Sequence, residues 1–376
     1  MVYSKLMIST RYIKMSKTIL VFSKYGRRGA SSRVRTLQYI PYIEELGWHV
    51  TCQPLLSDRY LRSKYSTSRI SSILSATLLA VGYVRRLVKL ASALRYDVIW
   101  IEKELYPYFP ATFERLLSII GAKVVVDYDD AIFHLYDQHR SRIVRYLLGR
   151  KIDVVMRSAT CVMVGNQYLK EHAFYAGAVD VQIIPTVVDL ESWVPRVKST
   201  ELSPVVIGWI GTPLTSRYLL DIIPSIKRVL DGGGVKFVCV GGSKRVSDYL
   251  DVEIREWSEE TEVSDIQSFD IGVMPVPDGP WERGKCGYKI IQYMACGVPA
   301  VASPVGVNVD IVEDGVCGFL AENIIEWDRR LLELVNSSRL RKEMGSAGRE
   351  RVEHSYSVQA QLAKLNRVLV TVSMSG

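Results

Sequence analysis

The chain has 376 residues, of which 48% are hydrophobic and 23% are charged, and its formal net charge is +8. This length exceeds what one hydrophobic core usually supports, so we expect two domains. The totals exclude a low-complexity chain and a solenoid of short repeats, and the longest apolar run, residues 73–84, is too short to span a bilayer.

The first half of the chain alternates strand-like and helix-like segments. Short β-branched runs predict strands, and longer periodic runs predict helices. The expected strands are 18–23, 48–55, 97–101, 122–126, 159–165 and 181–185, and the expected helices are 33–46, 66–94 (as one helix or two), 114–120 and a short one from 166. A strand, a glycine-bearing loop, a helix and a second strand are the opening of a parallel α/β domain.

The pattern restarts after residues 185–198, which contain two prolines and no clear period and are therefore the expected linker. The following strands are predicted at 205–211, 235–242, 270–276 and 299–303, and the helices at 215–230, 261–268, 288–295, 322–336, 339–355 and 358–370. A short helix and the segment VEIREW (252–257), which has no assigned element, come between the second strand and the helix at 261–268. We expect an α/β protein with two Rossmann-like domains whose parallel sheets face a central cleft. A ligand would lie in that cleft, at the carboxyl ends of the strands.

The positive charge is concentrated in the first half. Residues 1–199 contain 29 Lys and Arg against 16 Asp and Glu, whereas the remainder is mildly acidic. This asymmetry predicts an anionic partner for the first half, which could be a membrane surface, a phosphorylated lipid or nucleic acid, with a solvated basic face as the alternative. The segment from Lys64 to Arg95, with its cluster of Arg85, Arg86 and Lys89, is the expected membrane contact.

The six cysteines are scattered, without a CxxC pair or a Cys/His cluster at zinc-ligand spacing. They are expected to be buried free thiols, which fits a reducing cytoplasm. The N-terminus is a poor signal peptide, and Met15 begins a natural start, so residues 1–16 are expected to be an extension. The domains are then 17–198 and 199–355, with a last helix, 356–376, crossing back to the first domain.

Two motifs in the second half point to an anionic ligand. In GWIGTPLTSR (208–217) a buried strand ends in Gly-Thr-Pro before a helix, which exposes backbone N–H groups, and Arg217 lies one turn into that helix. In GKCGYK (284–289) the glycines allow close approach of a ligand, and Lys285 and Lys289 have no nearby acid. Two lysines at this spacing repel each other unless an anion lies between them.

Longer segments resemble a family 4 glycosyltransferase. IGWIGTP (207–213), FDIGVMPVPDGPWERGKCGYKIIQYMACGVPAVASPVGVN (269–308) and GSAGRERVEHSYS (345–357) resemble its C-terminal half; SSRVRTLQYIPYIEELGWHVT (31–51), VVVDYDDAIF (124–133) and VQIIPTVVDLESW (181–193) resemble its N-terminal half. The resemblance covers roughly Lys17 to Leu369 and implies the GT-B fold. It also implies a retaining enzyme without a divalent metal, with a nucleoside-diphosphate sugar in the second domain and an acceptor in the first.

The resemblance assigns donor-binding residues position by position. Gly211 matches a family glycine, Thr212 stands in place of the arginine after it, and Arg217 stands in place of a lysine five residues further. Arg217 is therefore the expected main diphosphate ligand, with Lys285 or Lys289 replacing the missing cation. Two family glutamates are replaced by Gly284 and Gln292.

Gln292 can still hydrogen-bond a ribose hydroxyl. Sugar contacts are expected from the backbone N–H groups of Lys285, Cys286 and Gly287, with Tyr288 in the same segment. The loss of both glutamates leaves the identity of the donor open.

The first domain supplies the expected catalytic carboxylates. Asp127, Asp129 and Asp130 occupy the place where relatives often have a histidine-aspartate pair facing the sugar, and a carboxylate there could orient the acceptor hydroxyl or accept its proton. Alternation along an extended segment places Asp127 and Asp129 on one face, and at least one of the three acids is expected to cap the next helix. Arg33 or Arg35 could bind an anionic acceptor or the donor phosphate.

The sequence thus predicts a hexosyltransferase-like, metal-independent glycosyltransferase that uses UDP- or GDP-sugar, needs no cofactor and builds a surface polysaccharide, lipopolysaccharide or glycolipid. Its expected partners are the nucleotide sugar, a lipid-linked or glycan acceptor and the anionic inner membrane surface, without nucleic acid. The alternative is a basic membrane- or nucleic-acid-binding protein with a degenerate glycosyltransferase fold. A nicotinamide-dependent enzyme is disfavoured, because KYGRRGA lacks the GxGxxG spacing.

Overall fold

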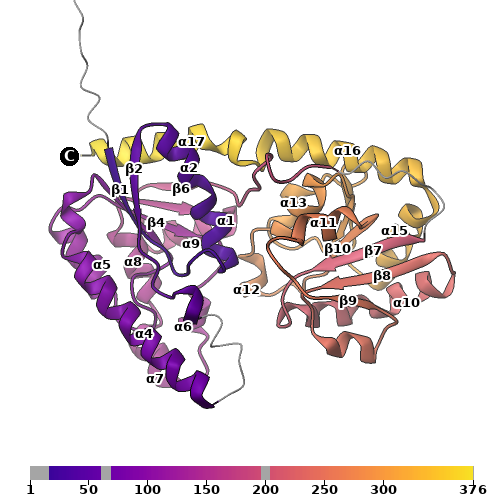
Figure 1. Ribbon diagram of the computed structural model, residues 1–376, viewed down its shortest axis with the longest axis horizontal. Coiled ribbons are helices and arrows are strands. Elements are labelled where there is room, and N and C mark those ends of the chain that lie inside the picture. The colour runs from indigo at the N-terminus through magenta and orange to yellow at the C-terminus, as the bar shows by residue number, and fades with distance from the viewer. Residues whose placement is uncertain (1–16, 61–68, 196–203, 376) are drawn as a thin grey trace, which may run out of the picture.

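The structure is a computed structural model that describes residues 17–60, 69–195 and 204–375. It contains two α/β domains that lie side by side, with two long helices running along one side of both (Figure 1). Each domain is built on a six-stranded sheet in which every neighbouring pair of strands is parallel. In the described part of the chain no helix is long and apolar enough to cross a bilayer.

The first sheet has the strand order β2-β1-β3-β4-β5-β6. Its strands are β1 (Lys17–Phe22), β2 (Trp48–Cys52), β3 (Val98–Glu102), β4 (Val124–Tyr128), β5 (Cys161–Val164) and β6 (Val181–Ile183). Its helices are α1 (Ala30–Arg35), η1 (Leu37–Tyr39), α2 (Ile40–Glu45), α4 (Arg69–Leu90), η2 (Ala93–Arg95), α5 (Thr112–Ile119), α6 (His134–Asp137), α7 (Arg142–Leu148), α8 (Lys151–Ser158) and α9 (Gln167–Tyr175). Because β3 and β4 are buried on both faces, they are almost continuously apolar.

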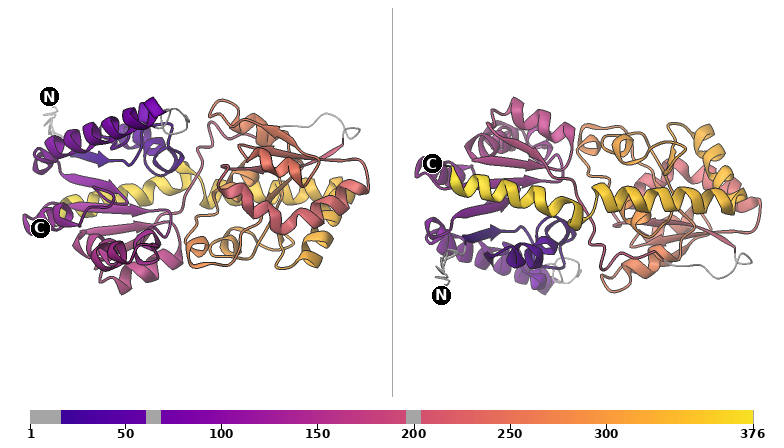
Figure 2. Two further views of the ribbon diagram at one scale, coloured as in Figure 1. Left: turned by 90° about the horizontal axis from the view of Figure 1, so that it is seen from below. Right: turned by 90° about the horizontal axis from the view of Figure 1, so that it is seen from above.

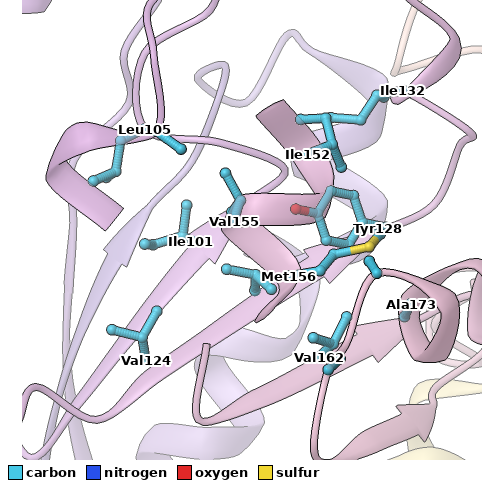
Figure 3. Close-up of a cluster of buried hydrophobic side chains, with 14 of the residues drawn as sticks. Ile101, Leu105, Val124, Tyr128, Ile132, Ile152, Val155, Met156, Val162 and Ala173 are labelled. Atoms are coloured by element: carbon cyan, nitrogen blue, oxygen red, sulfur yellow. The ribbon is translucent and has the colours of Figure 1, made fainter. Parts of the chain in front are cut away.

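The core of the first domain lies between this sheet and the helices that follow its strands. Ile101, Val124 and Val162 project from the sheet toward Ile152, Val155 and Met156 of α8 (Figure 3). Tyr128 also points into this cluster (Figure 3), so its neighbours along β4 point to the opposite face.

The second sheet has the order β12-β11-β10-β7-β8-β9. Its strands are β7 (Val205–Ile210), β8 (Val235–Val240), β9 (Glu253–Arg255), β10 (Ile271–Met274), β11 (Ala300–Ala302) and β12 (Gly318–Leu320). Its helices are η3 (Thr215–Ile222), α10 (Ile223–Asp231), η4 (Lys244–Asp248), α11 (Glu262–Gln267), α12 (Pro280–Arg283), α13 (Tyr288–Ala295), α14 (Asn308–Ile311) and α15 (Ile324–Asn336).

The last two helices join the domains. Helix α16 (Ser338–Ser355) packs on α13, and α17 (Val358–Met374) packs on the first sheet, where Leu365 and Leu369 are buried (Figure 1). Two backbone hydrogen bonds tie the crossing to the linker: Val188 N–H donates to the Tyr356 carbonyl, and Val358 N–H donates to the Val188 carbonyl. Part of the predicted linker, residues 196–198, lies outside the described residues, as does the predicted extension 1–16.

Two predicted helices differ from those observed. The helix expected at 33–46 is divided into α1, η1 and α2, with Pro41 at the start of α2. The helix expected at 215–230 begins as the 3-10 segment η3, and α10 restarts with Pro224 in its first turn. Proline lacks the N–H that a continuous helix needs, so each helix restarts at the proline.

The predicted basic cluster on α4 also differs. Arg86 is fully buried beneath the helix, where it donates to the Leu105 carbonyl at 3.0 Å and to Gln53 Oε1 at 2.9 Å. Burial lowers its pKa to about 10. Of the three, Arg85 is exposed, whereas Lys89 is half-buried and donates to the Tyr96 hydroxyl at 2.6 Å, so a surface cluster of three cations is not present. The start of the predicted membrane segment, residues 64–68, lies outside the described residues.

Candidate active site

The two domains contact each other directly at the segment that contains Gly284. Asn166 of the first domain donates from Nδ2 to the carbonyls of Gly284 and Lys285, each at 3.0 Å. The Cys286 thiol donates to the Asp129 carbonyl at 2.7 Å, and burial raises the pKa of this thiol to about 12. The GKCGYK segment is therefore docked on the first domain, next to the predicted catalytic carboxylates.

The close approach explains the glycine at 284. A Cβ atom at this position would lie 2.5 Å from the Ala131 Cβ and 2.8 Å from the Ala131 nitrogen. On the other side of the contact, a Cβ at Gly165 would lie 2.3 Å from the Cys286 sulfur. The position at which relatives have a glutamate is thus occupied by the backbone of the other domain, and no side chain fits there in this arrangement.

Helix α13 begins at this contact and carries three of the predicted donor ligands. Gly287 at its N-cap has φ +62°, and no side chain caps the helix. Lys289 is in the first turn, and Gln292, which is buried, follows one turn later, so both lie on a similar face. The first N–H groups of α13 and its dipole favour an anion on that side.

Lys289 is a cation without an ion-pair partner among the described residues, although the charge of Asp130 acts on it. Its ammonium lies 5.6 Å from the centre of the Trp209 ring, and a Cβ on Gly211 would lie 3.0 Å from the Lys289 Cε, so the predicted glycine loop covers this side chain. Within the described residues neither Lys289 nor Lys285 has an ion-pair partner. Burial and the charge of Lys285 lower the pKa of Lys289 to about 8.

Arg217, the predicted main diphosphate ligand, is exposed and stacks on Tyr218 with its guanidinium 5.2 Å from the ring centre. The Tyr218 hydroxyl donates to Glu282 Oε1 at 2.5 Å. The charge of Glu282 thus acts on Arg217, as the charge of Asp130 acts on Lys289. Thr212 is exposed, and its N–H donates to Thr215 Oγ1 at 3.2 Å.

In the first domain, Asp127 and Arg35 form a buried ion pair. Both oxygens of Asp127 accept from Arg35, and the Nη1 of Arg35 also donates to the Ile184 carbonyl at 2.6 Å. Desolvation opposes the charges, but the carboxylate raises the pKa of Arg35. Arg35 therefore does not offer the anion site expected from the sequence, and Asp127 holds Arg35 in place instead of facing a substrate.

Asp129 and Asp130 lie beside Lys103, which the sequence analysis did not single out. The Lys103 ammonium is 2.8 Å from Asp129 Oδ1 and 3.4 Å from Asp130 Oδ2, and the Ser31 hydroxyl donates to Asp129 Oδ2 at 2.8 Å. Although burial opposes it, the charges of Lys103 and Arg35 lower the pKa of Asp129 to about 2. Asp129 is therefore a permanent anion at neutral pH, suited to orient a hydroxyl or stabilise positive charge.

Lys103 reaches these carboxylates through a strained turn. Its φ is +65°, and the Glu104 N–H donates to the Glu102 carbonyl at 2.8 Å, which makes Lys103 the centre of a γ-turn. Glu102, at the end of β3, accepts from the hydroxyls of Ser31 and Ser32 and from the Lys24 N–H. Glu102 and Lys103 directly follow the predicted strand 97–101, and charged residues at the carboxyl end of a parallel strand are the sequence pattern that indicates such a cluster.

Arg33 joins the domains. Its Nη2 donates to both oxygens of Glu262 at 3.2 Å, and its guanidinium lies 5.1 Å from the centre of the Trp257 ring. Nearby, Arg27 is 3.0 Å from Glu259. In this arrangement Arg33 is bound mainly by protein carboxylates of the second domain and not free for a phosphate. Among the described residues no group of three His, Cys, Asp or Glu side chains is placed to hold a metal ion.

Comparison with known proteins places this geometry in context. Residues 204–337 match the family model described as "Glycosyl transferases group 1". The uncharacterized glycosyltransferase MJ1178 of Methanocaldococcus jannaschii is 41% identical over 66 residues, which are 17% of this chain and 19% of that protein. The capsular polysaccharide biosynthesis glycosyltransferase CapM of Staphylococcus aureus is 28% identical over 169 residues, 41% of this chain and 43% of CapM. The matched region is thus less than half of either relative.

Solved structures match nearly the whole chain. The crystal structure of Anabaena Alr3699/HepE in complex with UDP has a TM-score of 0.62 at 14% identity and covers 94% of this chain and 100% of that one. Sucrose-phosphate synthase from Thermosynechococcus elongatus has a TM-score of 0.67 at 15% identity, covering 94% and 99%. The protein therefore has the GT-B fold, and residues 204–337 of its second domain match the glycosyl transferases group 1 model.

Proposed function

We propose that this protein is a glycosyltransferase that moves a sugar from a nucleoside-diphosphate sugar to an acceptor hydroxyl. The observation that carries the proposal is a pair of cations at the start of α13, Lys285 and Lys289, that have no ion-pair partner among the described residues. This pair lies in the segment that contacts the loop of Asp129 and Asp130. If the diphosphate binds at Lys289, the sugar attached to it would lie between the two domains.

In this proposal the second domain binds the leaving group. The ammonium groups of Lys285 and Lys289 and the first N–H groups of α13 neutralise the diphosphate as charge develops on it, which lowers the barrier to its departure. Arg217 and the backbone at Gly211 and Thr212 contribute at the outer end. Gln292 hydrogen-bonds the ribose, and the backbone N–H groups of Cys286 and Gly287, with Tyr288, lie beside the sugar.

The first domain binds the acceptor. Asp129 or Asp130 orients the acceptor hydroxyl, and the low pKa of Asp129 favours an electrostatic role for it over proton abstraction. The protein cations take the charge-neutralising role that a divalent metal has in other transferases, so we propose a metal-independent reaction without a cofactor. By its resemblance to family 4, we propose that the anomeric configuration is retained.

The donor is proposed to be a UDP-sugar, with a GDP-sugar as the alternative. Support for UDP comes from the similar fold of Alr3699/HepE, which was solved with UDP and with UDP-glucose. The name of CapM supports a role in surface polysaccharide synthesis, with lipopolysaccharide or glycolipid as related products. The acceptor is then lipid-linked or a glycan, and the enzyme is proposed to act in the cytoplasm at the inner face of the membrane.

A binding screen tests the proposal. The full chain is titrated with UDP, GDP, ADP and CMP by calorimetry, and the best nucleotide is followed by its sugars in a transfer and hydrolysis assay. We expect one nucleoside diphosphate to bind with an affinity that Lys289→Ala weakens by about 1.5 kcal/mol or more, as for a charge-assisted bond. Lys342→Ala, an exposed lysine on α16, is the control and should leave binding unchanged.

Wild-type affinity of the Lys289→Ala variant would show that the donor site is assigned wrongly. Nucleotide binding without transfer or hydrolysis of any sugar would instead favour a degenerate glycosyltransferase.

A further inference from the structure

Helix α4 exposes a row of apolar residues, in addition to Tyr83 and Leu90, which pack on the core of the first domain. A helix at the surface of a globular domain normally buries its apolar face and exposes its polar one. Along α4 the exposed side instead carries a stripe of apolar residues: Leu74, Ala80, Val81, Val84, Leu87 and Val88. Val84 and Val88 have 61% and 69% of their surface exposed.

The inner side of the same helix is held by polar contacts and close backbone packing. A Cβ on Gly82 would lie 2.1 Å from the Leu55 carbonyl oxygen, so the helix lies directly on the backbone there. The Tyr83 hydroxyl donates to the Pro107 carbonyl at 2.8 Å, and Arg86 is buried among the carbonyls of Ser23, Gln53 and Leu105. Because these contacts fix the rotation of α4, the apolar stripe cannot turn inward.

The charge around the stripe is of one sign. Residues 59–96 contain eight Lys and Arg and no Asp or Glu. Of these cations, Arg59, Arg85 and Arg95 are exposed, and Arg85 lies at the edge of the stripe. An apolar stripe bordered by cations is the pattern of a helix that lies in the headgroup region of an anionic membrane.

We infer that the outer face of α4 docks on an anionic lipid bilayer, with the valine and leucine side chains inserted between headgroups and the arginines on the lipid phosphates. The 22 residues of α4 would lie about 33 Å along the surface without crossing it. This inference rests on the proposed location at the membrane and adds the surface of the protein that binds the lipid. It does not depend on the transfer reaction.

A second copy of this chain is a less suitable occupant of the same face. In a two-fold symmetric contact each α4 would face the other, and the acid-free segment 59–96 would meet its own cations. An anionic bilayer has the opposite charge and also accepts apolar side chains, so it satisfies both properties of the face.

The test uses the full chain and sedimentation with vesicles of phosphatidylglycerol mixed into phosphatidylcholine, compared with pure phosphatidylcholine, in the absence of any nucleotide sugar. We expect binding to the anionic vesicles only. The variant Val84→Asp/Val88→Asp should lose about tenfold or more in partitioning, because it removes inserted apolar surface and adds repelled charge.

A matched control pair lies on α7. Ile143 and Leu147 have the same spacing, are 71% and 67% exposed and are also flanked by arginines, but α7 lies toward the other edge of the first domain, among the magenta helices in Figure 2. Ile143→Asp/Leu147→Asp should keep wild-type partitioning, and both variants should keep the wild-type melting temperature because all four side chains are exposed.

Equal partitioning of the α4 variant and the wild type overturns the inference, as does an equal loss in the α7 variant or equal binding to neutral vesicles. A dimer in solution that the α4 variant converts to a monomer also overturns it, in favour of a contact between copies. If the wild-type chain binds anionic vesicles but transfers no sugar, the proposed function is wrong and the inference about α4 is unaffected.

Discussion

The two domains differ in whether the cations at their contact are paired with carboxylates. In the first domain Arg35 is paired with Asp127, Lys103 with Asp129 and Asp130, and Arg33 with Glu262 of the second domain. In the second domain Lys285 and Lys289 have no ion-pair partner among the described residues. Paired charges build a rigid surface, whereas cations without a partner can bind an anionic ligand. Replacing a paired cation should therefore change stability, and replacing an unpaired one should change ligand binding.

The largest expected effect is on stability, from breaking a compensated pair. Arg35→Met leaves Asp127 charged and buried, which we expect to lower the free energy of unfolding by about 3–5 kcal/mol. Urea denaturation followed by circular dichroism measures this change. Arg339→Met, in a highly exposed pair on α16, is the control and should cost less than about 1 kcal/mol. Equal effects of the two variants would remove the distinction between the two classes of cation.

Removing an uncompensated cation should have the opposite profile. Lys289→Met relieves the burial of an unpaired charge, so we expect unchanged or slightly higher stability, together with nucleotide affinity weaker by about 1.5–3 kcal/mol. Thermal melting and calorimetry on the same sample separate the two effects. A variant that unfolds more easily and still binds wild-type amounts of nucleotide would show Lys289 to be structural.

Restoring the family glutamate should be harmful here. Gly284→Glu places a side chain where Ala131 lies, so we expect the domains to separate and transfer activity to fall, at a packing cost of about 1–3 kcal/mol. Small-angle scattering should show a more open molecule. Gly232→Ala is the control, because Gly232 has an ordinary helical φ of −68° and an added Cβ there would lie no closer than 3.3 Å to another atom. A gain of activity in Gly284→Glu would contradict the steric explanation.

The smallest predicted effect concerns pH. Burial lowers the pKa of Lys289 from 10.5 to about 8, so the charged lysine disfavours folding below pH 8, and this penalty decreases as the pH rises from 8 to the unfolded pKa. Nucleotide binding needs the protonated form, so affinity should fall above pH 8, by at most about tenfold per pH unit. Calorimetry between pH 7 and 9.5 measures the slope. In the Lys289→Met variant, affinity should not fall above pH 8. If it still falls, another group is responsible for the titration.

Local pattern was sufficient for much of the fold. Helix α13 was predicted with the observed bounds, Tyr288–Ala295, because a glycine precedes it and its apolar residues are regularly spaced. The GT-B fold followed from the motifs and their resemblance. The roles of Asp127 and Arg35 could not be predicted, because their pairing joins residues 92 positions apart, and either side chain by itself looks equally suited to bind a substrate.

The position of Gly284 shows the same limit. The sequence reveals that a charge is lost, but the reason, contact with Ala131 of the other domain, exists only once both domains are folded and together. Lys103 was missed because a lysine at the end of a strand is usually an exposed residue, and its positive φ has no signal in the sequence.

The two chain crossings between the domains meet at one point, where Val188 bonds to both Tyr356 and Val358. Because both connections pass through this point, we expect the domains to pivot there if they move apart. Such a movement would separate the ion pairs of Arg27 and Arg33 with the second domain and the hydrogen bonds that Asn166 and Cys286 make between the domains.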